Sequence, residues 1–178
     1  MGWRGHLAAV LLAVAGCAPA SAAASVFDAP VPQRVSQESE GLQTAIFAGG
    51  CFWGVEAVFS HVRGVKSAVS GYHGGNAATA TYQRVSSGTT AHAEAVRVVY
   101  DPAVVSYDQL LQVFFSVIAD PTLKNRQGPD VGPHYRSALV PLTLDQRAVA
   151  AAYLEQMRAS DVWSDPIVTR IEPARRFY

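Results

Sequence analysis

The 178-residue chain is poor in cysteine, and its charges of opposite sign balance. Its two cysteines, Cys17 and Cys51, are too few for a disulfide-stabilised scaffold. Its 14 basic and 14 acidic residues give a formal net charge of +0, and without a basic stripe we expect no nucleic-acid partner. No internal repeat is present. The histidines beyond the N-terminal region lack the paired spacing of metal ligands, so we expect no metal site (His61, His73, His92, His134).

The N-terminal region contains an apolar run that is too short to cross a bilayer. A polar start precedes the apolar residues 7–15, a pattern typical of a signal peptide. Residues 14–17, Val-Ala-Gly-Cys, resemble a bacterial lipobox, in which the cysteine is acylated and becomes the mature N-terminus. We therefore expect lipidation of Cys17 and a membrane-anchored periplasmic lipoprotein of the bacterial cell envelope. The alternative is a secreted or soluble periplasmic protein, cleaved within residues 20–24.

Composition divides the remaining chain into a linker and one folded domain. We assign residues 1–24 to the signal peptide and the start of a tether. Residues 25–42 are expected to form a flexible linker, because the segment that contains them is rich in Ala, Ser and Pro. Residues 43–178 are long enough to bury a core and are expected to form a single domain.

The hydrophobic pattern of this domain predicts an α/β fold. Its strands and helices are expected in the order β-α-β-β-α-β-α-β, which predicts a two-layer sandwich with a mixed β-sheet. The loop at 120–134 is dense in Pro, Gly and Asn, and a loop of this length is usually functional. The predicted strands are 44–48, 65–72, 93–100, 137–142 and 167–171, and the predicted helices are 53–62, 106–118 and 143–160.

Residues 49–54, Gly-Gly-Cys-Phe-Trp-Gly, form the most informative motif of the chain. Cys51 is predicted to lie where the first strand turns into the first helix. The N-terminal dipole and N–H groups of a helix stabilise a thiolate, which is the nucleophilic form of cysteine. The glycines permit a tight turn that brings backbone close to a ligand. The alternative is that Cys51 is a small buried hydrophobic residue, as free cysteine often is.

The motif Gly-Cys-Phe-Trp-Gly, followed by Glu56, resembles the signature of the A-type peptide methionine sulfoxide reductases (MsrA). This family reduces the S-epimer of methionine sulfoxide. The resemblance runs from about Thr44 to the C-terminus, and several separated blocks follow in the family's order. These blocks are Gly-Tyr-His-Gly-Gly at 71–75, the Tyr-to-Val block at 82–96, Asp-Pro-Thr at 120–122, residues 125–137, and Phe-Tyr at 177–178.

The resemblance implies that Cys51 attacks the sulfoxide sulfur, releases methionine and becomes a sulfenic acid. Glu94 is the expected acid. It shares a strand face with Val96 and Val98, and apolar surroundings raise the pKa of a carboxyl group, so that it can give a proton to the sulfoxide oxygen. The enzyme class implied is peptide-methionine (S)-S-oxide reductase, which repairs oxidised proteins.

The remaining site residues are carried over from the same blocks. Phe52 and Trp53 are expected to bind the substrate by forming an apolar cage around its methyl group. Tyr82 and Tyr135 are expected to donate hydrogen bonds to the sulfoxide oxygen, as catalytic residues. Asp130 is expected on the substrate side as an orienting residue.

The chain departs from many family members in two ways. No cysteine follows Cys51, so an external thiol is expected to reduce the sulfenic acid. We therefore expect no bound cofactor and a thioredoxin-like electron donor, for which dithiothreitol can substitute. Relatives continue past Phe-Tyr, so we expect the C-terminal tail to be truncated. The expected substrate is free or protein-bound methionine sulfoxide, and the expected state is a monomer with no membrane contact except a lipid anchor.

Two other functions compete with this interpretation. A one-cysteine thiol peroxidase or redox sensor would also form a sulfenic acid, but it gives no reason for the aromatic pair or for Glu94. A surface lipoprotein that binds peptides in an aromatic groove would not depend on the Cys51 thiol. Peroxide consumption without sulfoxide reduction would favour the first function, and binding that survives Cys51→Ser would favour the second.

Overall fold

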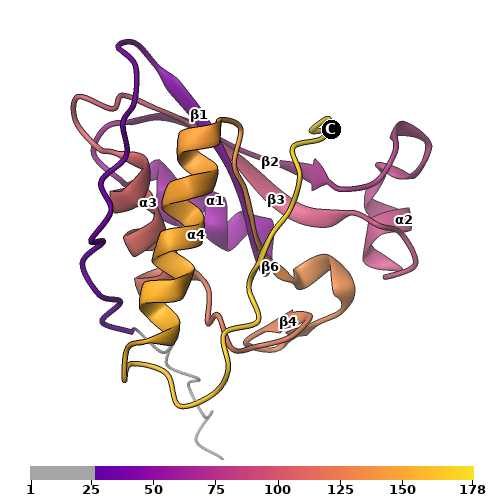
Figure 1. Ribbon diagram of the computed structural model, residues 1–178. Helices are drawn as coiled ribbons and strands as arrows, with labels where there is room; N and C mark the ends of the chain where they lie inside the picture. The colour runs from indigo at the N-terminus through magenta and orange to yellow at the C-terminus, as the bar shows by residue number, and fades with distance from the viewer. Residues whose placement is uncertain (1–26) are drawn as a thin grey trace, which may run out of the picture.

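The computed structural model describes residues 27–178, and its elements follow the predicted order (Figure 1). The eight elements that correspond to the prediction are β1 (Gln43–Gly49), α1 (Phe52–Ser60), β2 (Val65–His73), β3 (Ala93–Tyr100), α3 (Tyr107–Val113), β6 (Ser137–Val140), α4 (Leu144–Arg158) and β7 (Arg170–Ile171). Gln109 Oε1 accepts a hydrogen bond from the backbone N–H of Ser106 at 3.0 Å, and Thr143 Oγ1 accepts one from Gln146 at 3.0 Å. These hydrogen bonds cap the helices at Ser106 and Thr143, so the predicted helix starts at 106 and 143 are confirmed.

The structure adds short elements that hydrophobic periodicity does not reveal. The loop at 120–134 holds a small hairpin of β4 (Arg126–Gln127) and β5 (Asp130–Val131), followed by the 3₁₀ turn η3 (Pro133–Tyr135). A short helix, α2 (Tyr82–Ser86), and a 3₁₀ turn, η1 (Ala77–Thr79), precede β3. The second predicted helix, 106–118, changes after α3 into one π-helical turn, η2 (Phe114–Ile118).

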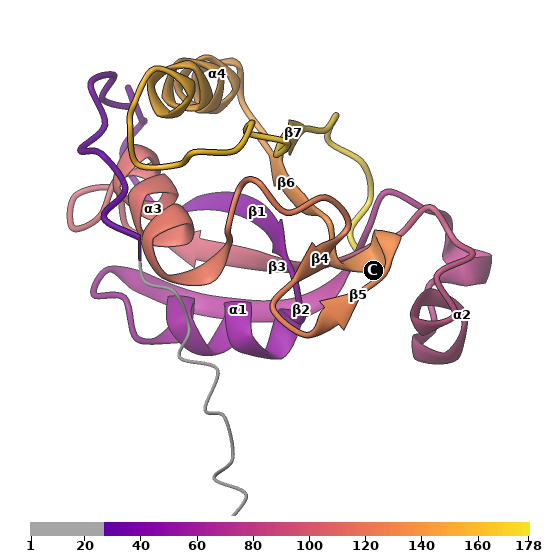
Figure 2. The ribbon, with the colours of Figure 1, turned by 90° about the horizontal axis from the view of Figure 1, so that it is seen from below.

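The main sheet is mixed, as predicted. Its strand order is β2-β3-β1-β6-β7; neighbours are antiparallel except β6 and β7, which are parallel. Phe47 on β1 lies opposite Val96 on β3 and Leu139 on β6, so these three side chains share one face of the sheet. Figure 2 shows α1 running along β2 and β3, with α4 near the other end of the sheet.

The core forms between that face and the helices. Phe47 packs against Phe59 of α1 and Phe114 of η2, with ring centroids 4.8 and 5.4 Å apart. The opposite face of the sheet carries small residues such as Ala48, Ala95 and Ala138, against which Phe177 packs. Tyr178 and Tyr72 exchange two backbone hydrogen bonds of 2.9 and 3.0 Å. The C-terminal segment therefore lies along β2, close to the strand that precedes the expected site.

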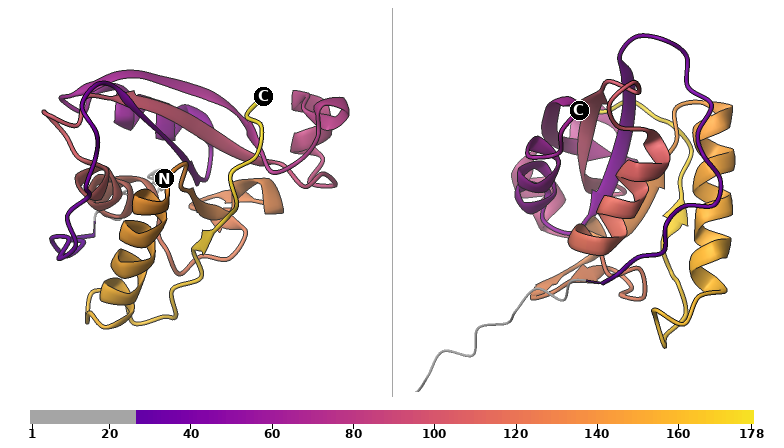
Figure 3. Two further views of the ribbon diagram at one scale, coloured as in Figure 1. Left: turned by 45° about the horizontal axis from the view of Figure 1, so that its top comes forward. Right: turned by 90° about the vertical axis from the view of Figure 1, so that its left-hand side faces the viewer.

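The segment expected to be a flexible linker is instead packed on the helices over residues 27–42. Ala29 is buried, Tyr153 of α4 donates a 2.7 Å hydrogen bond to the carbonyl of Pro30, and Asp108 of α3 accepts bonds from the backbone and hydroxyl of Ser36. Figure 3 shows this segment passing α3 and α4. Its Ala- and Pro-rich composition predicted a tether, but its polar groups pair with residues about 70 to 120 positions away in sequence.

The predicted signal peptide, including Cys17, lies outside the described residues. Within residues 27–178, no helix is both long and apolar enough to cross a membrane.

Candidate active site

Cys51 lies between the last residue of β1 and the first residue of α1, as the motif predicted. Gly50 adopts φ +90°, and a Cβ atom there would lie 2.7 Å from the Cβ of Gln127. A Cβ atom at Gly49 would lie 2.7 Å from the Phe114 ring. The two glycines therefore permit both the backbone turn and its close contact with the core. Cys51 is half-buried and unpaired, and its carbonyl accepts the N–H of Gly54 at 3.1 Å.

Glu94 is buried next to the start of α1. Its side chain on β3 is only 3% exposed, and its Oε2 accepts a 3.0 Å hydrogen bond from the backbone N–H of Phe52. Burial raises the pKa of the carboxyl group; the N–H of Phe52 opposes this rise, and the negative charge of Asp130 adds to it. The structure thus gives Glu94 the environment of a proton donor. Its carboxyl group is bonded to Phe52, the residue that directly follows the nucleophile.

Tyr135 lies near enough to four other residues selected from the sequence for their charges to change its pKa. Its pKa is raised to about 12, mainly by burial and then, in decreasing order, by the charges of Glu94, Asp130, Cys51 and Tyr82. These groups come from η3, β3, β5, the β1–α1 turn and α2, so the fold brings separated blocks of the sequence together. A tyrosine with a pKa this high keeps its proton at neutral pH and remains a hydrogen-bond donor.

The two aromatic residues after Cys51 differ in exposure. Phe52 is buried, whereas Trp53 is 69% exposed, and their ring centroids lie 6.2 Å apart. The Phe52 ring also lies 5.7 Å from that of Tyr72. Phe52 therefore joins the core to the site, while Trp53 is free to contact a ligand from solvent.

Tyr72 is a site residue that the sequence interpretation did not select. It pairs with Glu94 across β2 and β3. Burial and the charges of Glu94 and Tyr82 raise its pKa. It belongs to the Gly-Tyr-His-Gly-Gly block, but only the strand register shows that it faces the acid.

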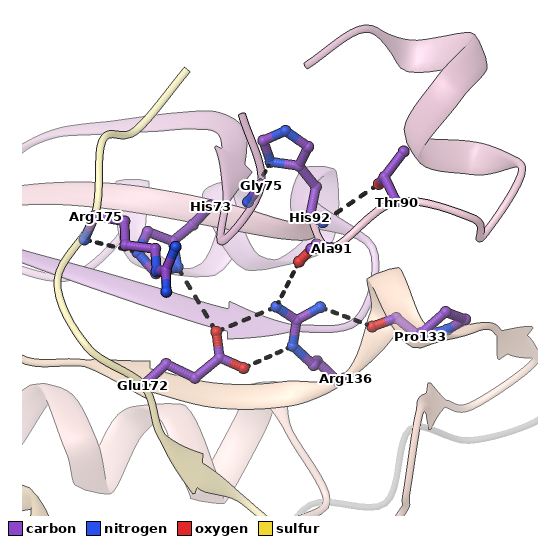
Figure 4. A network of polar contacts seen from close by, with 9 residues as sticks. All are labelled: His73, Gly75, Thr90, Ala91, His92, Pro133, Arg136, Glu172 and Arg175. Carbon is purple, nitrogen blue, oxygen red and sulfur yellow. Dashed lines mark hydrogen bonds and ion pairs between the residues drawn. The ribbon is translucent and has the colours of Figure 1, made fainter. Parts of the chain in front are cut away.

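A polar network of Arg136, Glu172 and His73, which was not predicted from the sequence either, lies next to the turn that carries Tyr135. The Arg136 guanidinium donates hydrogen bonds to the carbonyls of Pro133 at 3.0 Å and Ala91 at 3.1 Å, and pairs with Glu172 at 2.7 Å (Figure 4). The buried ring of His73 lies 3.7 Å from the same carboxylate. Burial alone would raise the pKa of Glu172, but His73 and Arg136 lower it to about 2. Arg136 thus ties the turn that carries Tyr135 to the start of β3.

A cavity of about 430 Å³ adjoins Cys51. It is lined by one face of α1, by η2 and by the loop after η2, and Glu94, Tyr82 and Tyr135 are not among its lining residues. Among residues 27–178, no group of three or more His, Cys, Asp or Glu side chains is arranged to hold a metal ion.

The family model for peptide methionine sulfoxide reductase matches residues 43–178 of the chain. The chain belongs to this family. It is 52% identical over 144 residues to peptide methionine sulfoxide reductase MsrA 2 of Synechocystis sp., a match that covers 81% of this chain and 67% of the relative. The chain is thus an oxidoreductase that acts on methionine sulfoxide.

Solved structures of this family share its fold. Mxr1 from Saccharomyces cerevisiae in reduced form matches with a TM-score of 0.67 and 32% identity, over 82% of this chain and 83% of that one. The structure of Mxr1 in complex with Trx2 matches with a TM-score of 0.51 and 25% identity, over 80% and 85% of the two chains. The predicted single-domain α/β fold with a mixed sheet is therefore confirmed for this reductase.

Proposed function

We propose that this reductase acts on the S-epimer of methionine sulfoxide, free or in proteins, with Cys51 as nucleophile and Glu94 as acid. The observation that carries the proposal is the hydrogen bond from the N–H of Phe52 to Glu94, because it fixes a buried carboxyl group one residue from the thiol. A carboxyl group with a raised pKa beside a nucleophilic cysteine suits a reaction in which an oxygen must be protonated as its bond to sulfur breaks.

The proposed first step transfers the oxygen from substrate to enzyme. The Cys51 thiolate attacks the sulfoxide sulfur, Glu94 protonates the oxygen, and the oxygen passes to Cys51, giving methionine and a Cys51 sulfenic acid. Tyr82 and Tyr135 donate hydrogen bonds to the oxygen as its charge grows. Phe52 and Trp53 hold the methyl group of the substrate, and Asp130 orients it. An apolar wall opposite these donors distinguishes the two epimers, because only one places both methyl and oxygen correctly.

The proposed second step returns Cys51 to its thiol. A first external thiol displaces the hydroxyl of the sulfenic acid as water and forms a mixed disulfide, and a second thiol then releases Cys51. A thioredoxin-like protein is the proposed donor. The complex of the structural relative Mxr1 with Trx2 supports this assignment.

The test measures methionine release from the separate S- and R-epimers of a blocked methionine sulfoxide, with and without dithiothreitol. We expect one equivalent of methionine from the S-epimer without reductant, turnover with reductant, and neither in Cys51→Ser. Equal turnover of both epimers, or peroxide consumption without sulfoxide reduction, would contradict the proposal. The peroxide measurement also tests the competing thiol peroxidase function.

We also propose that the protein is a lipoprotein of the bacterial cell envelope, acylated at Cys17. The lipobox-like residues 14–17 and the apolar run before them support this location. Expression in a bacterial host with a labelled fatty acid tests it: label and membrane association are expected in the wild type and are expected to be lost in Cys17→Ser. Release of an unlabelled wild-type protein into the periplasm would contradict lipidation.

A further inference from the structure

Cys51 is the one residue shared by two otherwise separate groups of site residues. Glu94, Asp130, Tyr82 and Tyr135 form the electrostatic cluster described above. None of these four residues lines the 430 Å³ cavity, which includes Cys51 and part of α1. The cavity therefore adjoins the nucleophile without including the catalytic cluster, although Pro129, which precedes Asp130, is one of its lining residues.

The cavity follows the part of α1 that carries Gly54, Val55 and Val58. Gly54 and Val58, which are four positions apart, line it together with Val55. Phe52, whose N–H points to Glu94, is not among its lining residues. The opposite wall comes from η2 and includes Val117, which is 49% exposed.

Displacement at a sulfur atom requires the incoming and departing atoms to lie on one line through the sulfur. In the sulfenic acid, the departing atom is the oxygen, which Glu94 and Tyr135 hold on their side of Cys51. The attacking thiol must then approach from the side away from these residues. A cavity that adjoins Cys51 and is not lined by Glu94 or Tyr135 offers a space for such an approach.

We propose that this cavity is the route by which the external thiol reaches the Cys51 sulfenic acid. The inference rests on the proposed function and extends it to the second step. Glu94 regains a proton from solvent after the first step. The incoming thiolate then forms a bond to the Cys51 sulfur, the sulfur–oxygen bond breaks, and the hydroxyl leaves as water with this proton. The incoming sulfur is oxidised and the Cys51 sulfur is reduced. A second thiol of the same donor then releases Cys51 as a thiol and leaves the donor as a disulfide.

The lining suits a thiol on an uncharged arm. Most lining side chains are apolar, and Asp120 contributes the single ionisable side chain besides Cys51 among the lining residues. The carboxylate of Asp120 already accepts bonds from the backbone and hydroxyl of Thr122, at 2.9 and 2.6 Å. Both a small dithiol and a cysteine presented by a thioredoxin-like protein match this chemistry.

Filling the cavity tests the inference without touching the catalytic cluster. A Cβ atom built at Gly54 meets no atom within 4 Å, so the side chain of Gly54→Leu enters open space. Leu also has a higher helix propensity than Gly, so α1 is expected to be stabilised by the change. Val117→Trp fills the cavity from the opposite wall, at a residue exposed enough to accept a larger side chain. Ala57→Leu is the matched control, because Ala57 is exposed on the same helix but does not line the cavity.

Two rates are measured on the full chain. The first is methionine release in one turnover without reductant, and the second is the reaction of the resulting sulfenic acid with dithiothreitol or with thioredoxin. In Gly54→Leu and Val117→Trp, we expect unchanged methionine release and a second rate at least about 10-fold lower. Ala57→Leu is expected to match the wild type in both rates. Slowing with dithiothreitol alone, with thioredoxin alone, or with both supports the inference and identifies which donor uses the cavity.

An unaltered second rate in both filled variants would overturn the inference, because the thiol would then enter from the substrate side. Slower methionine release in both variants would also overturn it, since the cavity would then belong to the substrate. A wild-type chain that releases no methionine would refute the proposed function itself, and the inference with it. Normal release with an unaltered second step would refute the inference alone.

Discussion

The backbone N–H of Phe52 donates a 3.0 Å hydrogen bond to Oε2 of the buried Glu94. Because Phe52 directly follows Cys51, this bond fixes the carboxyl group relative to the thiol through a single residue of backbone. The acid and the nucleophile come from positions 43 residues apart, yet neither depends on a flexible loop for its place. Preorganisation of this kind is what proton transfer to a departing oxygen requires.

Replacing Glu94 with Gln is expected to slow methionine release in a single turnover by about 100- to 10,000-fold. The amide oxygen can still accept the Phe52 bond, but the side chain has no acidic proton. In the wild type, burial raises the pKa of Glu94, so the rate is expected to fall as pH rises through that raised value. In the variant, this decrease of the rate with rising pH is expected to be absent.

Glu56→Gln is the control for this change. Glu56 lies on α1 and bonds to the backbone of Ser70, without contributing to the pKa shifts of Glu94 or Tyr135. A Glu94→Gln enzyme that keeps the wild-type pH profile would exclude Glu94 as the acid.

Replacing Tyr135 with Phe tests the second proposed donor. Its pKa of about 12 keeps the hydroxyl protonated at neutral pH, so the hydrogen bond to the oxygen is available throughout the working range. Loss of one hydrogen bond to a charged oxygen is expected to lower kcat about 10-fold, with little change in KM. Tyr107→Phe is a suitable control, because the buried Tyr107 hydroxyl has no partner among the described residues. Equal losses in both variants would show that Tyr135 has only a packing role.

Local patterns were sufficient to predict most of the fold and the position of Cys51 between β1 and α1. Alternating apolar residues predicted β3, and the glycines before Cys51 predicted the turn that holds it. The family resemblance supplied Glu94, Tyr82, Tyr135 and Asp130 from separate blocks. The charges of Glu94, Asp130, Cys51 and Tyr82 all raise the pKa of Tyr135, so the fold brings these separate blocks near one another.

The parts that could not be predicted depend on pairings between distant residues. Tyr72 faces Glu94 only because of the register between β2 and β3. Arg136 and Glu172 are separated by 36 residues, and nothing in the local sequence links them. The packing of residues 27–42 was missed for the same reason, since composition predicts flexibility but not the partners that remove it.

The Ser36–Asp108 contact tests whether residues 27–42 belong to the folded domain. Asp108 accepts bonds from the backbone and hydroxyl of Ser36 at 2.9 and 2.8 Å, and both residues are buried. Asp108→Ala is expected to lower the free energy of unfolding by about 1–3 kcal/mol, because it leaves these donors without their acceptor. Urea unfolding measures this loss. Asp28→Ala, at an exposed position of the same segment, is expected to have little effect. Identical unfolding curves for both variants would restore the flexible-linker interpretation.

The Arg136–Glu172 pair links stability at low pH to the position of Tyr135. The pKa of Glu172 is about 2 in the folded chain and about 4.3 in an unfolded one. Because the folded value is the lower one, the interactions of Glu172 with His73 and Arg136 contribute fully above the unfolded pKa, and their contribution is lost as pH falls from that value toward 2. The contribution at neutral pH is expected to be on the order of 3 kcal/mol.

Glu172→Gln is expected to lower stability at neutral pH and to flatten the loss of stability on acidification. It also frees the guanidinium that holds the carbonyls of Pro133 and Ala91, which precede Tyr135 and Glu94. We therefore expect a lower kcat as well, measured at a temperature where the variant is fully folded. Glu155→Gln removes an exposed ion pair of α4 and is expected to change neither property. If Glu172→Gln reduced stability but left kcat and the pH profile unchanged, the pair would be structural and would have no role in positioning Tyr135.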